Sequence, residues 1–173
     1  MTSVVVTVLG ADRPGLVQSI SASVAACGGN WLESRMARLA GQFAGILLID
    51  LPAGADAALA AAMAKLEADG LRVIVQAGAA EAPAAAETVM LELVGQDRPG
   101  IIRDITAILA RLGVNIEELS TDVQSGSFSG EAMFRAQARL RVPEGLAVQV
   151  LRTEVERLGN ELMVDFGAGG AAR

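Results

Sequence analysis

The chain has 173 residues, of which 52% are hydrophobic, and a formal net charge of −6, with no histidine. The acidic balance argues against direct nucleic-acid binding, because Lys and Arg contacts to phosphates supply most of that affinity. No apolar run approaches the ~18 residues that indicate a membrane-spanning helix, so we expect no membrane association. The absence of histidine removes the commonest general base.

Cysteine usage and the N-terminus bear on the cellular compartment. Cys27 is the only cysteine, so no intramolecular disulfide can form, which fits a reducing environment. The first residues contain no charged segment leading into an apolar core, so we expect no signal peptide. Together these features predict a cytoplasmic protein.

The chain contains an internal repeat. The hexapeptide Gly10-Ala11-Asp12-Arg13-Pro14-Gly15 returns as Gly95-Gln96-Asp97-Arg98-Pro99-Gly100, and residues 9–30 match residues 94–115 at 10 of 22 positions. A repeat at this spacing predicts two small domains, each only marginally stable alone. We expect domain 1 over residues 1–77, a linker over 78–87, domain 2 over 88–167 and a flexible tail over 168–173.

The first repeat begins with Val4–Leu9, a β-branched run whose two apolar faces predict a central strand covered on both sides. Pro14 suits the first position of a helix. Apolar residues at helical spacing then predict a helix that ends at Gly28-Gly29. Strands over 31–39 and 43–51, an alanine-rich helix over 57–68 and a strand over 71–75 complete the order βαββαβ.

The second repeat predicts the same order. Its strands are expected at 89–94, 116–124, 134–142 and 162–166, its helices at 101–112 and 148–158, and a Ser/Gly-rich loop at 125–130. Each repeat is therefore expected to adopt an α+β, ferredoxin-like fold, with an antiparallel four-stranded sheet and both helices on one face.

The outer sheet faces of the two repeats are expected to differ. Strand 43–51 lacks polar alternation, so we expect its outer face to pack on something. The second repeat has a row of arginines, Arg135, Arg139 and Arg141, which predicts a solvent-exposed face with cross-strand ion pairs to Glu118 and Asp122. Because bare sheet faces and edge strands are free to associate, we expect a homo-oligomer.

Both repeats resemble the amino-acid-sensing ACT module in the Gly-x-Asp-Arg-Pro-Gly turn, the helix, the Gly-x-Asn and the following strand. The first repeat is also similar to the glycine cleavage system transcriptional repressor family, in the segments 12–17, 28–36 and 39–44. This resemblance covers about residues 3–166. It implies a regulator with no catalytic role and no cofactor. It further implies that a small amino acid, with glycine favoured, binds where two modules meet, and that the protein holds a DNA-binding transcriptional regulator inactive.

In ACT modules the loop after the first strand and the start of the second strand form the site. The helix N-terminus offers backbone N–H groups at Gly15 and Leu16 to a carboxylate. Asn30 can serve either end of a zwitterion, and Asp12 is a candidate ammonium partner. Arg13 could bind a carboxylate in fork geometry or form a salt bridge across the domain interface. The corresponding candidates in the second repeat are Asp97, Arg98, Gly100, Ile101 and Asn115.

Purely structural roles are open for the same residues. Asp12 can cap the turn, Gly15 can start the helix, and Asn30 can occupy a post-helix turn. The chain would then be an interaction protein, or a regulatory subunit of a metabolic enzyme, with no ligand sensing. The sequence has no Walker-type loop, no Cys/His metal cluster and no dinucleotide fingerprint, so we expect no catalytic or metal-binding residues.

Overall fold

A computed structural model describes residues 2–78, 87–125, 131–158 and 162–168. The chain divides into two compact units, Met1–Ala82 and Pro83–Arg173, here called module 1 and module 2. Most of the expected linker (78–87), loop (125–130) and tail (168–173) lies outside the described residues, so the domain boundaries stay predictions. The helices that the structure describes are too short or too polar to cross a membrane.

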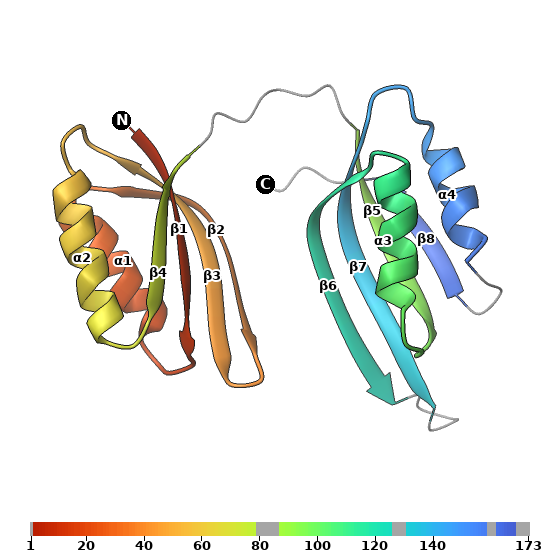
Figure 1. The fold of residues 1–173 in the computed structure, drawn as a ribbon, viewed down its shortest axis with the longest axis horizontal. Coiled ribbons are helices and arrows are strands. Elements are labelled where there is room, and N and C mark those ends of the chain that lie inside the picture. Colours follow the sequence, from red (N-terminus) through yellow and green to blue (C-terminus); the bar gives the residue numbers. More distant parts are fainter. Residues whose placement is uncertain (1, 79–86, 126–130, 159–161, 169–173) are drawn as a thin grey trace. The chain divides into compact units, whose positions relative to one another are not determined.

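Module 1 is a four-stranded antiparallel sheet with two helices on one face (Figure 1). The strands lie in the order β2-β3-β1-β4, so β1 is central as expected. On α1, Leu16, Ile20 and Val24 recur every four residues and are buried against the sheet. The elements are β1 (Thr2–Ala11), α1 (Leu16–Ala26), β2 (Asn30–Leu39), β3 (Gln42–Leu51), α2 (Asp56–Ala68) and β4 (Arg72–Ala77).

Module 2 has the same architecture, with sheet order β6-β7-β5-β8. Ile101, Ile105 and Leu109 of α3 repeat the buried spacing of α1. The ferredoxin-like α+β fold expected for each repeat is thereby confirmed. The elements are β5 (Glu87–Gln96), α3 (Ile101–Arg111), β6 (Asn115–Ser125), β7 (Ala132–Val142), α4 (Val148–Glu156) and β8 (Leu162–Ala168).

The turn from the first strand into the first helix differs from the expectation in one respect. Pro14 and Pro99 do not occupy the first helical position; they lie in the turn, and the helices begin at Leu16 and Ile101. The N-cap residues are Gly15 and Gly100, with φ of 90° and 93°. This left-handed conformation is open to glycine at little cost, which explains why a glycine precedes each helix.

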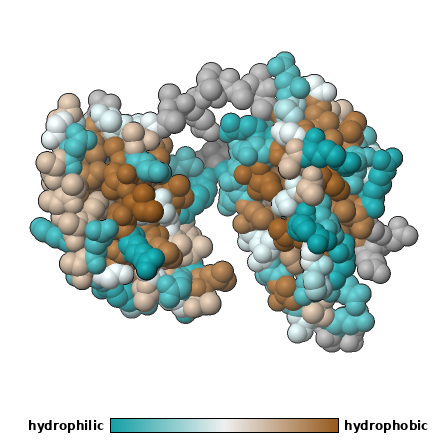
Figure 2. All heavy atoms as spheres, in the orientation of Figure 1, coloured by the Kyte–Doolittle hydropathy of each residue, from teal (hydrophilic) through white to brown (hydrophobic). Residues whose placement is uncertain are grey.

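The outer face of the module 1 sheet is apolar. Strand pairing places Val5 beside Leu48, Thr7 beside Ile46 and Ile74, and Leu9 beside Ala44 on the side away from the helices. Leu9 is 42% exposed and Ile74 57%, so the expectation that β1 is covered on both faces is wrong within the module. Part of the hydrophobic surface over β4 is visible in Figure 2.

The outer face of the module 2 sheet is polar, as expected. The positions that pair across it carry Arg139 beside Met90, and Gln137 beside Glu92. Gln137 Nε2 donates to Glu92 Oε1 at 2.8 Å. The same fold therefore tolerates either an apolar or a polar outer face.

The buried spacing on α1 gives a stability prediction. Ile20→Ala is expected to lower the free energy of unfolding of module 1 by about 2–5 kcal/mol, because Ile20 is fully buried and its truncation leaves a cavity. Val17 lies on the same helix but is 47% exposed, so Val17→Ala should change it by less than about 0.5 kcal/mol. Urea denaturation followed by circular dichroism measures both. Equal effects would contradict the assigned inward face of α1.

Candidate functional site

The Asp12–Gly15 turn of module 1 leaves a helix N-terminus open. Helix geometry gives the first N–H groups of α1 no intrahelical acceptor, and Gly15 has no side chain to cap them. A Cβ placed on Gly15 would meet no atom within 4 Å. The first turn of α1 carries no acidic residue, so no carboxylate of that turn offsets the positive end of the helix dipole.

The charged side chains of this turn contact their own module. Arg38 Nε donates to Asp12 Oδ2 at 2.6 Å, and the Asp12 N–H donates to the Gly41 carbonyl at 2.9 Å. Arg13 Nη2 donates to the Asp69 carbonyl at 3.1 Å, at the C-terminal end of α2. The sequence alternatives for Arg13 were a ligand carboxylate and a salt bridge across the domain interface, and this contact is neither. It is favourable because a cation at a helix C-terminus interacts with the negative end of the helix dipole.

The corresponding turn of module 2 is more crowded. Arg98 Nη1 donates to Asp104 Oδ2 at 3.2 Å, and Arg103 Nη2 donates to Asp104 Oδ1 at 2.8 Å. A Cβ on Gly100 would lie 3.1 Å from Arg103 Nη2. Asp104 belongs to the first turn of α3, so a carboxylate of the protein already lies where the helix dipole favours negative charge.

The two arginines also set the protonation of Asp104. Hydrogen bonds from Arg103 and, second, from Arg98 lower the pKa of this carboxyl below its usual value. The sequence patterns did not predict a role for Asp104. An acid in the first helical turn, six residues after Arg98, is the signal that could have found it.

Asn30 and Asn115 hold equivalent positions at the start of β2 and β6, and both are exposed. Each follows a Schellman-type helix end: the Gly29 N–H donates to the Val24 carbonyl, and the Val114 N–H to the Leu109 carbonyl. A β-bulge comes directly after each, between residues 31 and 33 and between residues 116 and 118. The local backbone around both asparagines is therefore the same.

The turn and the asparagine of one module lie far apart. Asn30 pairs with Asp50, and Asp50 with Ser3, near the beginning of β1, whereas the Asp12–Gly15 turn follows the end of β1 at Ala11. At about 3.3 Å per strand residue, the separation along the sheet is roughly 26 Å. Module 2 has the same topology. A single small amino acid therefore cannot contact both features of the same module.

The ion pairs between β6 and β7 differ in part from the arrangement expected. Arg139 pairs with Glu118 at 3.5 Å as expected, but Glu117 receives both Arg139, at 3.3 Å, and Arg141, at 2.5 Å. Glu117 is the bulge residue, and its side chain is only 17% exposed. Strict alternation along the strand would place Glu117 on the face opposite Glu118 and the arginines. The sequence pattern therefore did not predict its ion pairs with Arg139 and Arg141. Its counterpart in module 1 is Leu32.

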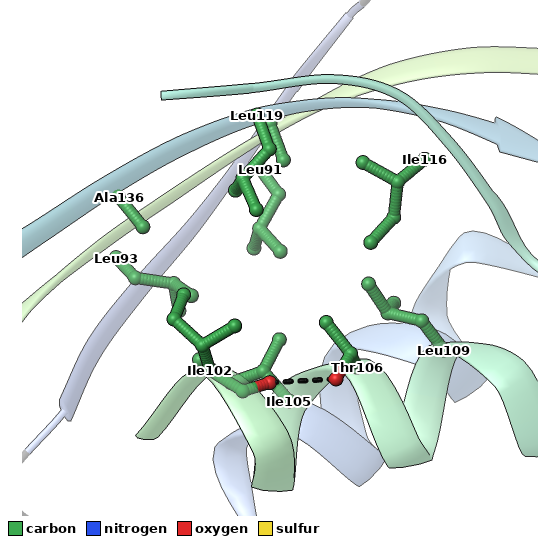
Figure 3. A pocket seen from close by; sticks show the side chains of 10 residues that line it. Leu91, Leu93, Ile102, Ile105, Thr106, Leu109, Ile116, Leu119 and Ala136 are labelled. Atoms are coloured by element: carbon green, nitrogen blue, oxygen red, sulfur yellow. Dashed lines mark hydrogen bonds between the residues drawn. The ribbon is translucent and has the colours of Figure 1, made fainter. Parts of the chain in front are cut away.

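Module 2 also contains an apolar pocket between α3 and the sheet (Figure 3). The space amounts to ≈ 10 Å³, about one water-sized sphere. The hydroxyl of Thr106 donates to the Ile102 carbonyl at 2.8 Å and is thereby satisfied. Two residues that line the pocket, Ile116 and Ala138, are smaller than their counterparts in module 1, Trp31 and Leu47. Its size and apolar lining do not suit an amino-acid zwitterion.

The residues that the structure describes contain no group of three His, Cys, Asp or Glu side chains arranged to hold a metal ion. The candidate residues are thus grouped at the two helix N-terminal turns and at the two asparagine ends. Ligand contact by the residues expected there stays a prediction.

Two segments of the chain match the ACT domain, residues 2–76 and residues 89–137. The glycine cleavage system transcriptional repressor of Escherichia coli (strain K12) is 29% identical over 171 residues, which cover 94% of this chain and 90% of that protein. The similarity therefore extends over both modules.

Two solved structures resemble nearly the whole chain. The crystal structure of a protein described only as unknown, from Galdieria sulphuraria, has 31% sequence identity and a TM-score of 0.83, and covers 96% of this chain and 98% of that one. A candidate glycine cleavage system transcriptional repressor has 21% identity and a TM-score of 0.68, and covers 97% and 98%. At this identity the second structure supports the fold alone.

The Asp104 cluster gives a prediction about pH. A pKa lowered in the folded state means that Asp104 stabilises module 2 above pH 3.8, the usual aspartate value, and that this contribution is lost as the pH falls through the lower folded-state pKa. Carboxyl NMR titration should show that Arg103→Gln raises the pKa of Asp104 more than Arg98→Gln does. An unchanged pKa in both variants would contradict the assigned hydrogen bonds.

Proposed function

Because this chain belongs to the ACT-domain family and carries two ACT domains in tandem, we propose that it is a non-catalytic regulator that responds to a small amino acid. Glycine is the favoured ligand, and a DNA-binding transcriptional regulator in the cytoplasm is the favoured partner. Similarity to the Escherichia coli glycine cleavage system transcriptional repressor over 94% of the chain carries the proposal. A homo-oligomer is part of it, since a module of about 80 residues buries little surface alone.

The α1 N-terminus of module 1 is the better carboxylate site of the two. Its Gly15 turn is open, and the first helical turn has no acid. The backbone N–H groups of Leu16 and Val17 can donate to a carboxylate there, with the helix dipole behind them. In module 2, Asp104 occupies the same region and already engages Arg98 and Arg103, so an incoming carboxylate would have to compete with Asp104 for them.

The turn and the asparagine lie at opposite ends of a module, which supports a ligand site built from two modules. If both contact one ligand, the turn comes from one module and the asparagine from another. Such a ligand stabilises the contact between the two modules, because its binding energy is available only when they meet. Amino-acid concentration would then control assembly, and through assembly the surface offered to the partner.

The alternative, an interaction protein without ligand sensing, also has a specific observation in its favour. Asp12 and Arg13 are both engaged within module 1, by Arg38 and by the Asp69 carbonyl. An ammonium group would have to share Asp12 with Arg38. The two functions differ in whether any amino acid binds the isolated protein.

The first test is a thermal-shift screen of the common amino acids. Glycine, or one close relative, is expected to raise Tm saturably, with about 2.7 kcal/mol of stabilisation at a ligand concentration 100 times Kd. Asn30→Ala or Asn115→Ala should weaken the shift, whereas Gln149→Ala, which removes an exposed amide on α4, should not. No shift with any amino acid would leave the interaction protein as the function.

The second test concerns the module 1 turn. Gly15→Ala is expected to cost about 1–2 kcal/mol of stability, since φ is 90° there, and to weaken the amino-acid response. Gly145→Ala is the control for backbone strain, because Gly145 has φ of 86° and equally open surroundings. It should cost similar stability and leave the response intact. Equal responses in the two variants would exclude the Gly15 turn as the binding point.

A further inference from the structure

The apolar outer face of the module 1 sheet has no counterpart in module 2. Alignment of the strand pairings places Glu92 at the position of Thr7, Gln137 at that of Ile46 and Asp165 at that of Ile74. Because module 2 adopts the same fold with these polar residues, the fold does not require the apolar ones. A contiguous exposed apolar surface of this kind marks a site of contact.

This face has a hollow on one side and a projecting side chain on the other. The hollow, ≈ 360 Å³, is lined by Val5, Ile46 and Leu48 and is bordered by Glu33 and Arg35 on β2. At the far edge of the same face, Ile74 on β4 is 57% exposed. The face therefore has a hollow near β2 and an exposed large side chain at β4.

A surface with these two features is complementary to itself. When two such sheets face each other about a two-fold axis parallel to the strands, between β3 and β1, β4 of each lies over β2 of the other. The sheet order β2-β3-β1-β4 and its register then bring Ile74 over the partner's Arg35, at the border of the hollow, and Leu9 onto the partner's Ala44. The same axis places Val5 over the partner's Leu48, so apolar side chains of the two copies meet, and each contact occurs twice, as in an isologous interface.

Polar groups at the rim are compatible with the same arrangement. Gln76 pairs with Val5, and Glu33 with Leu48, so both belong to one row across the sheet. The two-fold axis brings Gln76 of one chain over Glu33 of the other, where an amide N–H can donate to a carboxylate. Arg35, which pairs with Glu33 at 3.0 Å, keeps the rim neutral overall.

We propose that the outer face of the module 1 sheet is a self-association surface, on which the same face of a second copy of this chain packs. Four strands about 4.8 Å apart and roughly 26 Å long cover roughly 500 Å² per copy. The total of roughly 1,000 Å² is at the lower limit of specific interfaces. The dimer is accordingly reversible and concentration-dependent. This contact rests on the proposed self-association but does not require any amino acid.

Sedimentation velocity over a protein concentration series, without amino acids, tests the proposal. The wild type is expected to pass from monomer to dimer. Ile74→Asp and Ile46→Gln place on this face the residue types that module 2 carries, and each should weaken the dimer at least tenfold. Met163→Asp, which changes a 77% exposed side chain on the polar face of module 2, should leave the dimer unchanged.

A melting curve is measured for each variant to show that it is folded, as expected for a substitution at an exposed position. If Ile74→Asp does not fold, Ile46→Gln alone tests the proposal. Dimerisation of both folded variants at wild-type strength would overturn the proposal. A wild type that stays monomeric at every concentration would also overturn it, and would leave the face to a different protein. Neither result affects the thermal-shift test of amino-acid binding.

Discussion

Two helices can cover only one face of a four-stranded sheet, and the other surfaces of each module follow from this constraint. The covered face is apolar in both modules, because Leu16, Ile20 and Val24 in one, and Ile101, Ile105 and Leu109 in the other, must be buried. The opposite face carries no such requirement. It is apolar in module 1 and charged in module 2, so the fold does not determine its composition.

Chain direction imposes a second constraint. A strand followed by an antiparallel helix puts the strand-to-helix turn at one end of the module and the helix-to-strand turn at the other. Gly15 and Asn30 are therefore separated by roughly the length of β1. Both sites retain their backbone geometry in each repeat. A ligand that contacted both kinds of group would therefore have to bridge two modules.

The sequence predicted the fold well because its signals were local and repeated. Helical spacing of apolar residues and paired glycine turns occur in both halves, and each half supports the interpretation of the other. The error at Pro14 has a physical cause: the helix begins at Leu16, two residues after Pro14, because Gly15 takes the left-handed conformation. Propensity alone does not distinguish these two starts.

The ion pairs could be predicted only in part, because they depend on register. Arg139 and Glu118 face each other as simple alternation indicates, but the bulge after Ile116 turns Glu117 toward the same arginines. Arg13 reaches the Asp69 carbonyl, 56 residues away, a contact that no sequence pattern encodes. The contacts of the candidate site residues thus depend on residues far away in the sequence, and the hexapeptide motif alone does not predict them.

The two modules also act as controls for one another. Where they agree, as in the left-handed glycine, the Schellman-type helix end and the bulge, the shared backbone is what the fold and any common site need. Where they differ, the difference is informative. Asp104 closes a turn that is open at Gly15, and Asp165 replaces Ile74 on the outer face. Both changes make module 2 more polar at these positions, so the two modules share a backbone but differ in charge at the turn and on the outer face.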